Sequence, residues 1–124
     1  MITALMVKPG EHPCVTQIMD DREFLNCAVS MGTMFMCTAA SMPVEKGIIA
    51  IYAWDGVMAG LTGNRKIGKR ILAGTFYIVR EINGDLYSLT EADIAKYTSK
   101  LWKSKEFTDD QVIDSWFDGV WLAM

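Results

Sequence analysis

The sequence predicts an α+β fold, in which a small antiparallel or mixed sheet of about five to six strands packs against two to three helices. Three observations lead to this prediction. Short apolar runs bounded by turn residues fill most of the chain up to residue 89, and an Asp-Gly pair lies between two of them. After Thr90 the apolar period lengthens from two to about 3.6 residues, which indicates helices. The predicted order is ββαβββ(β)αα.

The chain is expected to open with a β-hairpin followed by a helix. Ile2–Lys8 and Cys14–Ile18 have strand composition, and the Pro9–Pro13 loop between them predicts that they pair antiparallel. Asp20 or Asp21 can then cap a helix, because the apolar residues that follow recur on one helical face: Phe24, Leu25, Ala28 and Val29.

The middle of the chain is expected to add strands. Gly32 should end the helix, and Met34–Thr38 is a short apolar segment that predicts a strand. Gly47–Trp54 is rich in isoleucine and leads into Asp55-Gly56, a pair typical of type I′ hairpin turns. Val57–Ala59 is therefore predicted to return as a strand.

The remaining segments are predicted as a loop, a long strand and two helices. Gly60–Lys69 contains several glycines and is expected to be a loop, whereas Leu72–Ile82 is expected to be the last long strand. Thr90 begins a Thr-x-x-Asp capping box, and the helix after it has one apolar face, formed by Ile94, Tyr97 and Leu101. Thr108 is expected to cap a second helix, with Asp109 and Asp110 in its first turn and Asp118-Gly119 at its end.

Length and composition limit the function classes. The 124 residues, 51% apolar and 22% charged, fit one globular domain without disulfides or metals. The net charge of -3 is too small for a DNA mimic, and its sign is wrong for a protein whose whole surface binds nucleic acid. Three cysteines without a CxxC pair argue against a disulfide framework and a zinc site. We expect no signal peptide, no membrane contact and a cytoplasmic location, because the first residues lack a basic region and no apolar run could span a bilayer.

Catalytic chemistry is hard to assemble from this sequence. His12 is the only histidine, and it could act as a base toward Cys14, although an exposed turn histidine is the simpler interpretation. The paired carboxylates at 20–21 and 109–110 are explained as helix caps rather than as catalytic pairs. No nucleotide-binding or metalloprotease motif is present, so we expect no enzyme activity, no cofactor and no metal.

The segment 63–70 is the densest charged feature and the best candidate site. Four of the twelve basic residues lie in it, between glycines whose backbone amides can approach a ligand. It predicts a phosphate-binding loop, and the alternative is a mobile, solvated loop. The candidate ligand-binding or partner-binding residues are Asn64, Arg65, Lys66, Lys69 and Arg70.

Apolar residues give a second candidate surface. Trp121 and Leu122 lie in the C-terminal segment. They either pack back on the sheet or form an interface with a partner, which could be a second copy of the chain in a homodimer. The methionines clustered at positions 31, 34, 36 and 42 could form an adaptable binding surface or fill the core.

The first predicted strand leads into the segment Met6-Val7-Lys8-Pro9-Gly10-Glu11-His12-Pro13. This segment resembles the v-x-P-G-x-x-P opening of a small family known as domain of unknown function 3846. Weaker matches follow in order at Asp20–Leu25, Gly32, Asp55-Gly56, Gly60–Arg65, Ile71–Thr75 and Gly84–Thr90. Met31-Gly32 and Ala53-Trp54 depart from the family's paired glycines and acidic pair. The resemblance covers residues 2 to 98, so we expect a single domain, 1–124, with a family-like part at 1–98 and a helical extension at 99–124.

The resemblance implies a setting in bacteriophages and mobile elements, with no assigned activity. The first hypothesis is therefore a non-enzymatic binding protein that interferes with a process of the bacterial host, such as a defence system, by binding a host protein or a small ligand. The second is a nucleotide-binding or nucleic-acid-binding module that uses the segment 63–70. The third is a small hydrolase with Cys14 and His12.

Overall fold

The α+β class is confirmed. The computed structural model describes the backbone of residues 1–123 and the side chains of residues 1–116. In chain order the elements are β1 (Ile2–Val7), β2 (Cys14–Ile18), α1 (Arg22–Val29), β3 (Ala39–Glu45), β4 (Ile48–Ala53), β5 (Gly63–Ile67), β6 (Arg70–Ala73), β7 (Phe76–Ile82), β8 (Asp85–Tyr87), α2 (Glu91–Lys100) and α3 (Asp109–Ala123).

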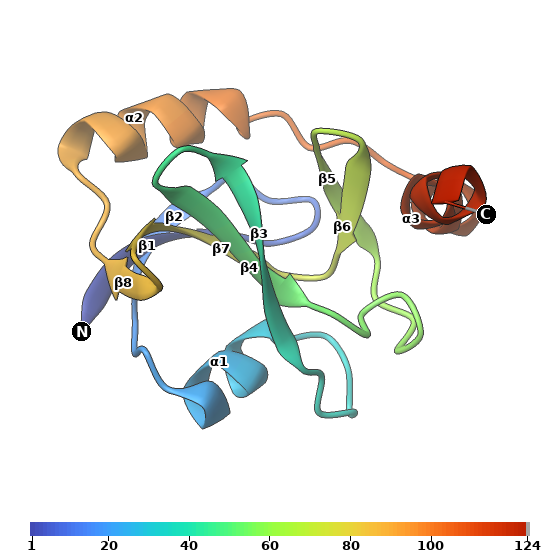
Figure 1. Cartoon of the computed structure of the whole chain (residues 1–124), viewed down its shortest axis with the longest axis horizontal. Helices are drawn as coiled ribbons and strands as arrows, with labels where there is room; N and C mark the ends of the chain where they lie inside the picture. Colours follow the sequence, from blue (N-terminus) through green and yellow to red (C-terminus); the bar gives the residue numbers. More distant parts are fainter. Residues whose placement is uncertain (124) are drawn as a thin grey trace.

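The main sheet is antiparallel throughout. Its strands follow the order β2-β1-β7-β4-β3, and β8 also pairs with β7, beside β1. The strands β5 and β6 form a separate two-stranded sheet. Helix α1 lies against one face of the main sheet and α2 against the other, whereas α3 lies beyond the β5–β6 hairpin (Figure 1).

Successive side chains of the central strands point to opposite faces of the main sheet, so an apolar core forms on each face. On the α2 face, Leu5 of β1 and Ile78 of β7 pack with Tyr97 of the helix. On the α1 face, Tyr77 and Val79 of β7 pack with Val29. The sheet is therefore covered on both sides, which explains why β4 is buried along its whole length.

The helix starts are as the sequence predicts. The Asp21 carboxylate accepts a hydrogen bond from the Phe24 amide at 3.0 Å at the start of α1. Thr90 and Asp93 form a reciprocal capping box at the start of α2. Thr108 forms a similar reciprocal pair with Gln111 before α3.

Two strand predictions are wrong in the middle of the chain. Met34–Thr38 forms no strand, and β3 begins only at Ala39. Val57–Ala59 does not return as a strand, because the chain makes consecutive turns from Trp54 to Gly60. The two edges of β4 are already paired with β3 and β7, so this segment has no strand to join.

Three further boundaries differ from the predictions. Gly60–Lys69 is not a loop throughout, because residues 63–67 pair with β6. The predicted strand Leu72–Ile82 is broken at Gly74, where φ is +83° and a Cβ would lie 2.7 Å from the Leu61 side chain. Helix α3 continues past Asp118-Gly119, since a glycine inside a helix costs only about 1 kcal/mol.

The free edge of β3 is partly covered by α1. The Ala39 amide donates to Asn26 Oδ1 and the Ala39 carbonyl accepts from Arg22 Nη1, both at 2.8 Å. In an antiparallel strand the backbone N–H and C=O groups of successive residues point to opposite edges. Ser41 and Pro43 are two and four residues after Ala39, so their backbone groups also point away from β4. Pro43 has no N–H to offer, so little of this edge can pair with another strand.

Across the described residues, no helix is long and apolar enough to cross a membrane.

Candidate functional site

The basic segment 63–70 forms most of the β5–β6 hairpin. Asn64 and Arg65 are buried, with 0% and 4% of their surface exposed, whereas Lys66 and Lys69 are exposed. Arg70 is half-buried, with its guanidinium carbon 4.6 Å from the centre of the Trp116 ring. The five candidate residues therefore do not face one common surface.

Arg65 lies at the centre of a buried hydrogen-bond network. Its Nε donates to the Leu101 carbonyl at 2.9 Å, Nη2 to the Glu11 carbonyl at 2.6 Å, and Nη1 to Asn64 Oδ1 at 2.8 Å. Asn64 Nδ2 in turn donates to two backbone carbonyls, those of Val7 and Gly74, both at 2.8 Å. Burial lowers the pKa of Arg65, and the carbonyl at the C-terminal end of α2 is a favourable partner for its charge.

This network joins the Pro9–Pro13 loop, the hairpin and the end of α2. Asn64 and Arg65 therefore hold these three segments together. The other three cations of the hairpin are in contact with solvent: Lys66 and Lys69 are exposed, and Arg70 is half-buried. The sequence gives no local signal for this arrangement, because the acceptors come from segments that are far away along the chain.

His12 is engaged with Trp102. Its Nδ1 lies 2.8 Å from the Trp102 carbonyl oxygen, and the two rings stack at 3.8 Å between centroids with an interplanar angle of 10°. Among the side chains that the structure describes, His12 hydrogen-bonds this carbonyl and not the Cys14 thiol. The arrangement fixes the imidazole against the segment after α2 rather than against the proposed nucleophile.

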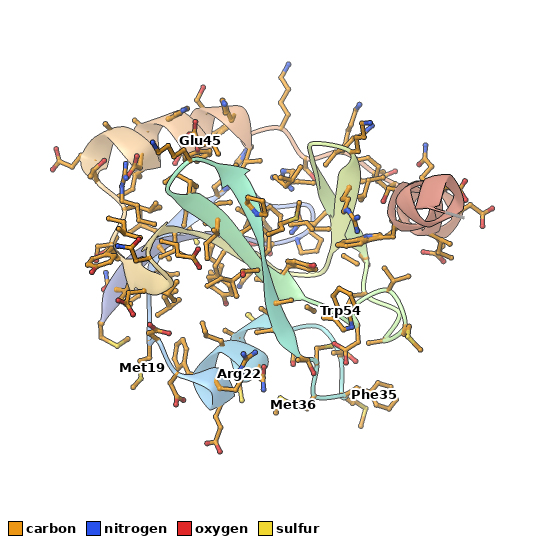
Figure 2. All side chains as sticks on the ribbon, viewed as in Figure 1. Met19, Arg22, Phe35, Met36, Glu45 and Trp54 are labelled. Atoms are coloured by element: carbon orange, nitrogen blue, oxygen red, sulfur yellow. The ribbon has the colours of Figure 1, made fainter. Side chains whose placement is uncertain are left out.

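A group of large apolar side chains is exposed on two neighbouring loops. We call it the apolar loop surface and define it by Met34, Phe35, Met36, Trp54 and Met58. The exposed fractions of these residues are 100%, 70%, 63%, 67% and 92%, in that order. Figure 2 shows Phe35, Met36 and Trp54 at the same end of the molecule, on the side of α1 and away from Glu45.

Hydrogen bonds fix the two loops to each other. The Trp54 amide donates to the Thr38 carbonyl at 2.8 Å, and the Thr38 amide donates to Asp55 Oδ1 at 2.8 Å. The Cys37 amide donates to Ser30 Oγ at 2.7 Å, and Cys37 itself is buried. These bonds hold the end of the first loop, at Cys37 and Thr38, against Ser30 and against the start of the second loop, at Trp54 and Asp55.

The methionines of the clustered set have different environments. Met34 and Met36 belong to the apolar loop surface, Met31 is 40% exposed beside it, and Met42 packs against the core on the α2 face. The sequence did not identify Phe35 and Trp54 as surface residues, because an apolar run beside an Asp-Gly turn is also typical of buried strands.

The C-terminal surface residues Trp121 and Leu122 have side chains outside the described residues. Trp116, five residues before Trp121 in α3, packs on β6 and donates from Nε1 to the Ile71 carbonyl at 2.8 Å.

One of the comparisons with known proteins identifies a family. Residues 2–101 match the sequence model of the family described as Domain of unknown function (DUF3846). No curated protein and no solved structure is significantly similar to the chain. The match covers the main sheet, the hairpin, α1 and α2, and it ends before α3.

Proposed function

The chain belongs to the DUF3846 family, and from its surface we propose that it is a non-enzymatic binding protein that contacts a protein partner through the apolar loop surface. The observation that carries this proposal is the exposure of five large apolar side chains on two loops that hydrogen bonds hold in place. Large apolar side chains exposed together on neighbouring loops are typical of protein interfaces.

The energetics favour a covered state. Burying a large apolar side chain gains about 1.5–3 kcal/mol relative to leaving it in water, so a partner that covers several of them gains appreciable free energy. Trp54 and Phe35 are the residue types that dominate interface energies, and the flexible methionines can adapt to the partner. Because hydrogen bonds already hold the two loops together, their backbone would lose little conformational entropy on binding.

The environment of His12 supports the non-enzymatic part of the proposal. Its ring is stacked on Trp102 and bonded to a carbonyl, so the Cys14 thiol lacks the base that a hydrolase would need. In this proposal the chain acts in the cytoplasm of a bacterial host, and its partner is a host protein whose function it inhibits. That setting, and the origin of the chain in a phage or mobile element, stay predictions.

Capture from bacterial lysate with matched variants tests the proposal. We expect the tagged chain to retain a host protein, and the double variant Phe35→Ser/Trp54→Ser to lose it. The control Val15→Ser/Tyr87→Ser removes apolar side chains that are 53% and 47% exposed elsewhere, and it should retain the partner. Equal capture by wild type and the loop variant would refute the assignment of the surface.

The alternative phosphate-binding function now depends on Lys66 and Lys69, which are the exposed lysines of the hairpin. Substituting both with alanine should abolish nucleotide or nucleic-acid binding and its salt dependence if this alternative holds. Arg65 and Asn64 are unsuitable for that test, because their loss would also disturb the fold.

A further inference from the structure

A groove separates α2 from the β5–β6 hairpin on the face of the sheet opposite to α1. Its volume is about 330 Å³, at the lower end of the range of small-molecule sites, which is about 300–1,000 Å³. Its lining combines polar groups with four aliphatic side chains: Val44, Ile67, Ile78 and Leu101. Figure 1 shows the hairpin beside the end of α2, where the chain leaves the helix.

Two exposed lysines line the same groove. Lys66 comes from β5 and Lys100 from the last turn of α2. Among the side chains that the structure describes, the ion pairs are Arg80–Asp93 and Lys96–Glu45, so neither lysine of the groove has a carboxylate partner.

Glu45, which follows Val44 of the groove in the sequence, is already paired with another lysine. Glu45 Oε1 accepts from Lys96 Nζ at 2.6 Å and also from the Tyr97 hydroxyl. The Lys100 ammonium lies 5.8 Å from the centre of the Tyr97 ring, which lines the groove. The groove therefore combines aliphatic side chains with two unpaired positive charges, in a chain whose net charge is -3.

We propose that this groove binds a small organic anion. Its apolar body would lie against Val44, Ile67 and Leu101, and its carboxylate or phosphate would lie between Lys66 and Lys100. The volume limits the ligand to a short alkyl chain or a single aromatic group. This site is separate from the apolar loop surface, which lies on the α1 side, so either one can fail without the other.

Amide chemical-shift titrations with hexanoate and with phenyl phosphate test the proposal and distinguish the two head groups. We expect at least one probe to shift the amides of Ile67, Gly68 and Leu101 in a saturable manner. Benzyl alcohol has the aromatic ring without an anionic group, and inorganic phosphate has the anionic group without a ring. Each should bind at least tenfold more weakly than phenyl phosphate.

Matched charge variants complete the test. Lys66→Gln/Lys100→Gln should weaken the binding of the preferred probe about tenfold, because two exposed ion contacts are lost. Lys103→Gln/Lys105→Gln removes the same charge from the exposed segment after α2, and it should change the affinity less than twofold. The proposal is overturned if neither probe shifts the groove amides, if both double variants bind equally, or if inorganic phosphate binds as tightly as phenyl phosphate.

Discussion

Arg80 and Asp93 form a bidentate ion pair that joins β7 to the first turn of α2. The Arg80 Nε donates to Asp93 Oδ2 at 2.7 Å and Nη2 donates to Oδ1 at 2.9 Å. Asp93 Oδ2 also accepts from the Thr90 amide, so one carboxylate caps the helix and holds it to the sheet. The hydrogen bonds from Arg80 are the largest cause of the lowered pKa of Asp93.

The first prediction concerns pH. Because the pKa of Asp93 is lower in the folded state than in the unfolded state, its contribution to stability is present above the unfolded pKa, about 3.9. This contribution is lost as the pH falls through the folded pKa. We expect Asp93→Asn to be less stable than wild type at pH 7, and the difference to shrink as the pH is lowered below about 4.

Urea unfolding of both proteins between pH 7 and pH 2 measures this difference. Glu91→Gln changes a neighbouring exposed carboxylate of the same helix and serves as the control. A stability difference between Asp93→Asn and wild type that stays constant over this range would contradict the assigned role of the ion pair.

The second prediction concerns the buried guanidinium. Arg65→Ala removes the donors for the carbonyls of Glu11 and Leu101 and for Asn64 Oδ1, and each unpaired buried acceptor costs about 1–3 kcal/mol. We expect the unfolding free energy to fall by about 3 kcal/mol or more, measured by urea denaturation. Lys66→Ala, at the next and exposed position, should change it by less than about 0.5 kcal/mol. Equal effects of the two substitutions would show that the network does not stabilise the fold.

The third prediction concerns the edge of the main sheet. Pro43→Thr adds an N–H that points away from β4 and lets the outer edge of β3 pair with another chain. We expect concentration-dependent self-association, measured by light scattering after size-exclusion chromatography. A lysine in place of Ser41, added to that variant, should restore the behaviour of wild type, because a charge on an edge strand opposes pairing. A Pro43→Thr protein that elutes like wild type at all concentrations would rule out this role of the proline.

The fourth prediction concerns the three thiols. Burial, followed by the charge of Asp55, raises the pKa of Cys37, whereas Cys14 and Cys27 are exposed. The thiolate is the reactive form, so iodoacetamide at pH 8 should label Cys14 and Cys27 at least tenfold faster than Cys37. Mass spectrometry of the digested protein measures the three rates, and fast labelling of Cys37 would contradict its burial.

The features that the sequence predicts well are those that depend on neighbouring residues. Examples are the helix cap at Asp21, the Thr90–Asp93 capping box and the strand before Trp54. Each of them depends on residues that lie only a few positions apart in the sequence. The features that it misses depend on distant partners. The predicted return strand Val57–Ala59, for example, needs an open edge of β4, and β3 and β7 already pair with that strand on its two sides.

The candidate site differs from the prediction for the same reason. Arg65 looks like a surface cation beside Lys66, but its acceptors lie 36 and 54 residues away in the sequence. Lys100 could not be grouped with Lys66 from the sequence, because only the packing of α2 beside the hairpin brings them to one groove.

The position of β7 in the sheet has a consequence for synthesis on the ribosome. It pairs with β1 on one side and β4 on the other, so β1–β2 and β3–β4 are separate hairpins until residues 76–82 have emerged. A nascent chain that stops before Phe76 therefore has two unpaired inner edges and no continuous sheet. The main sheet can therefore close only after β7, the strand that joins its two halves, becomes available.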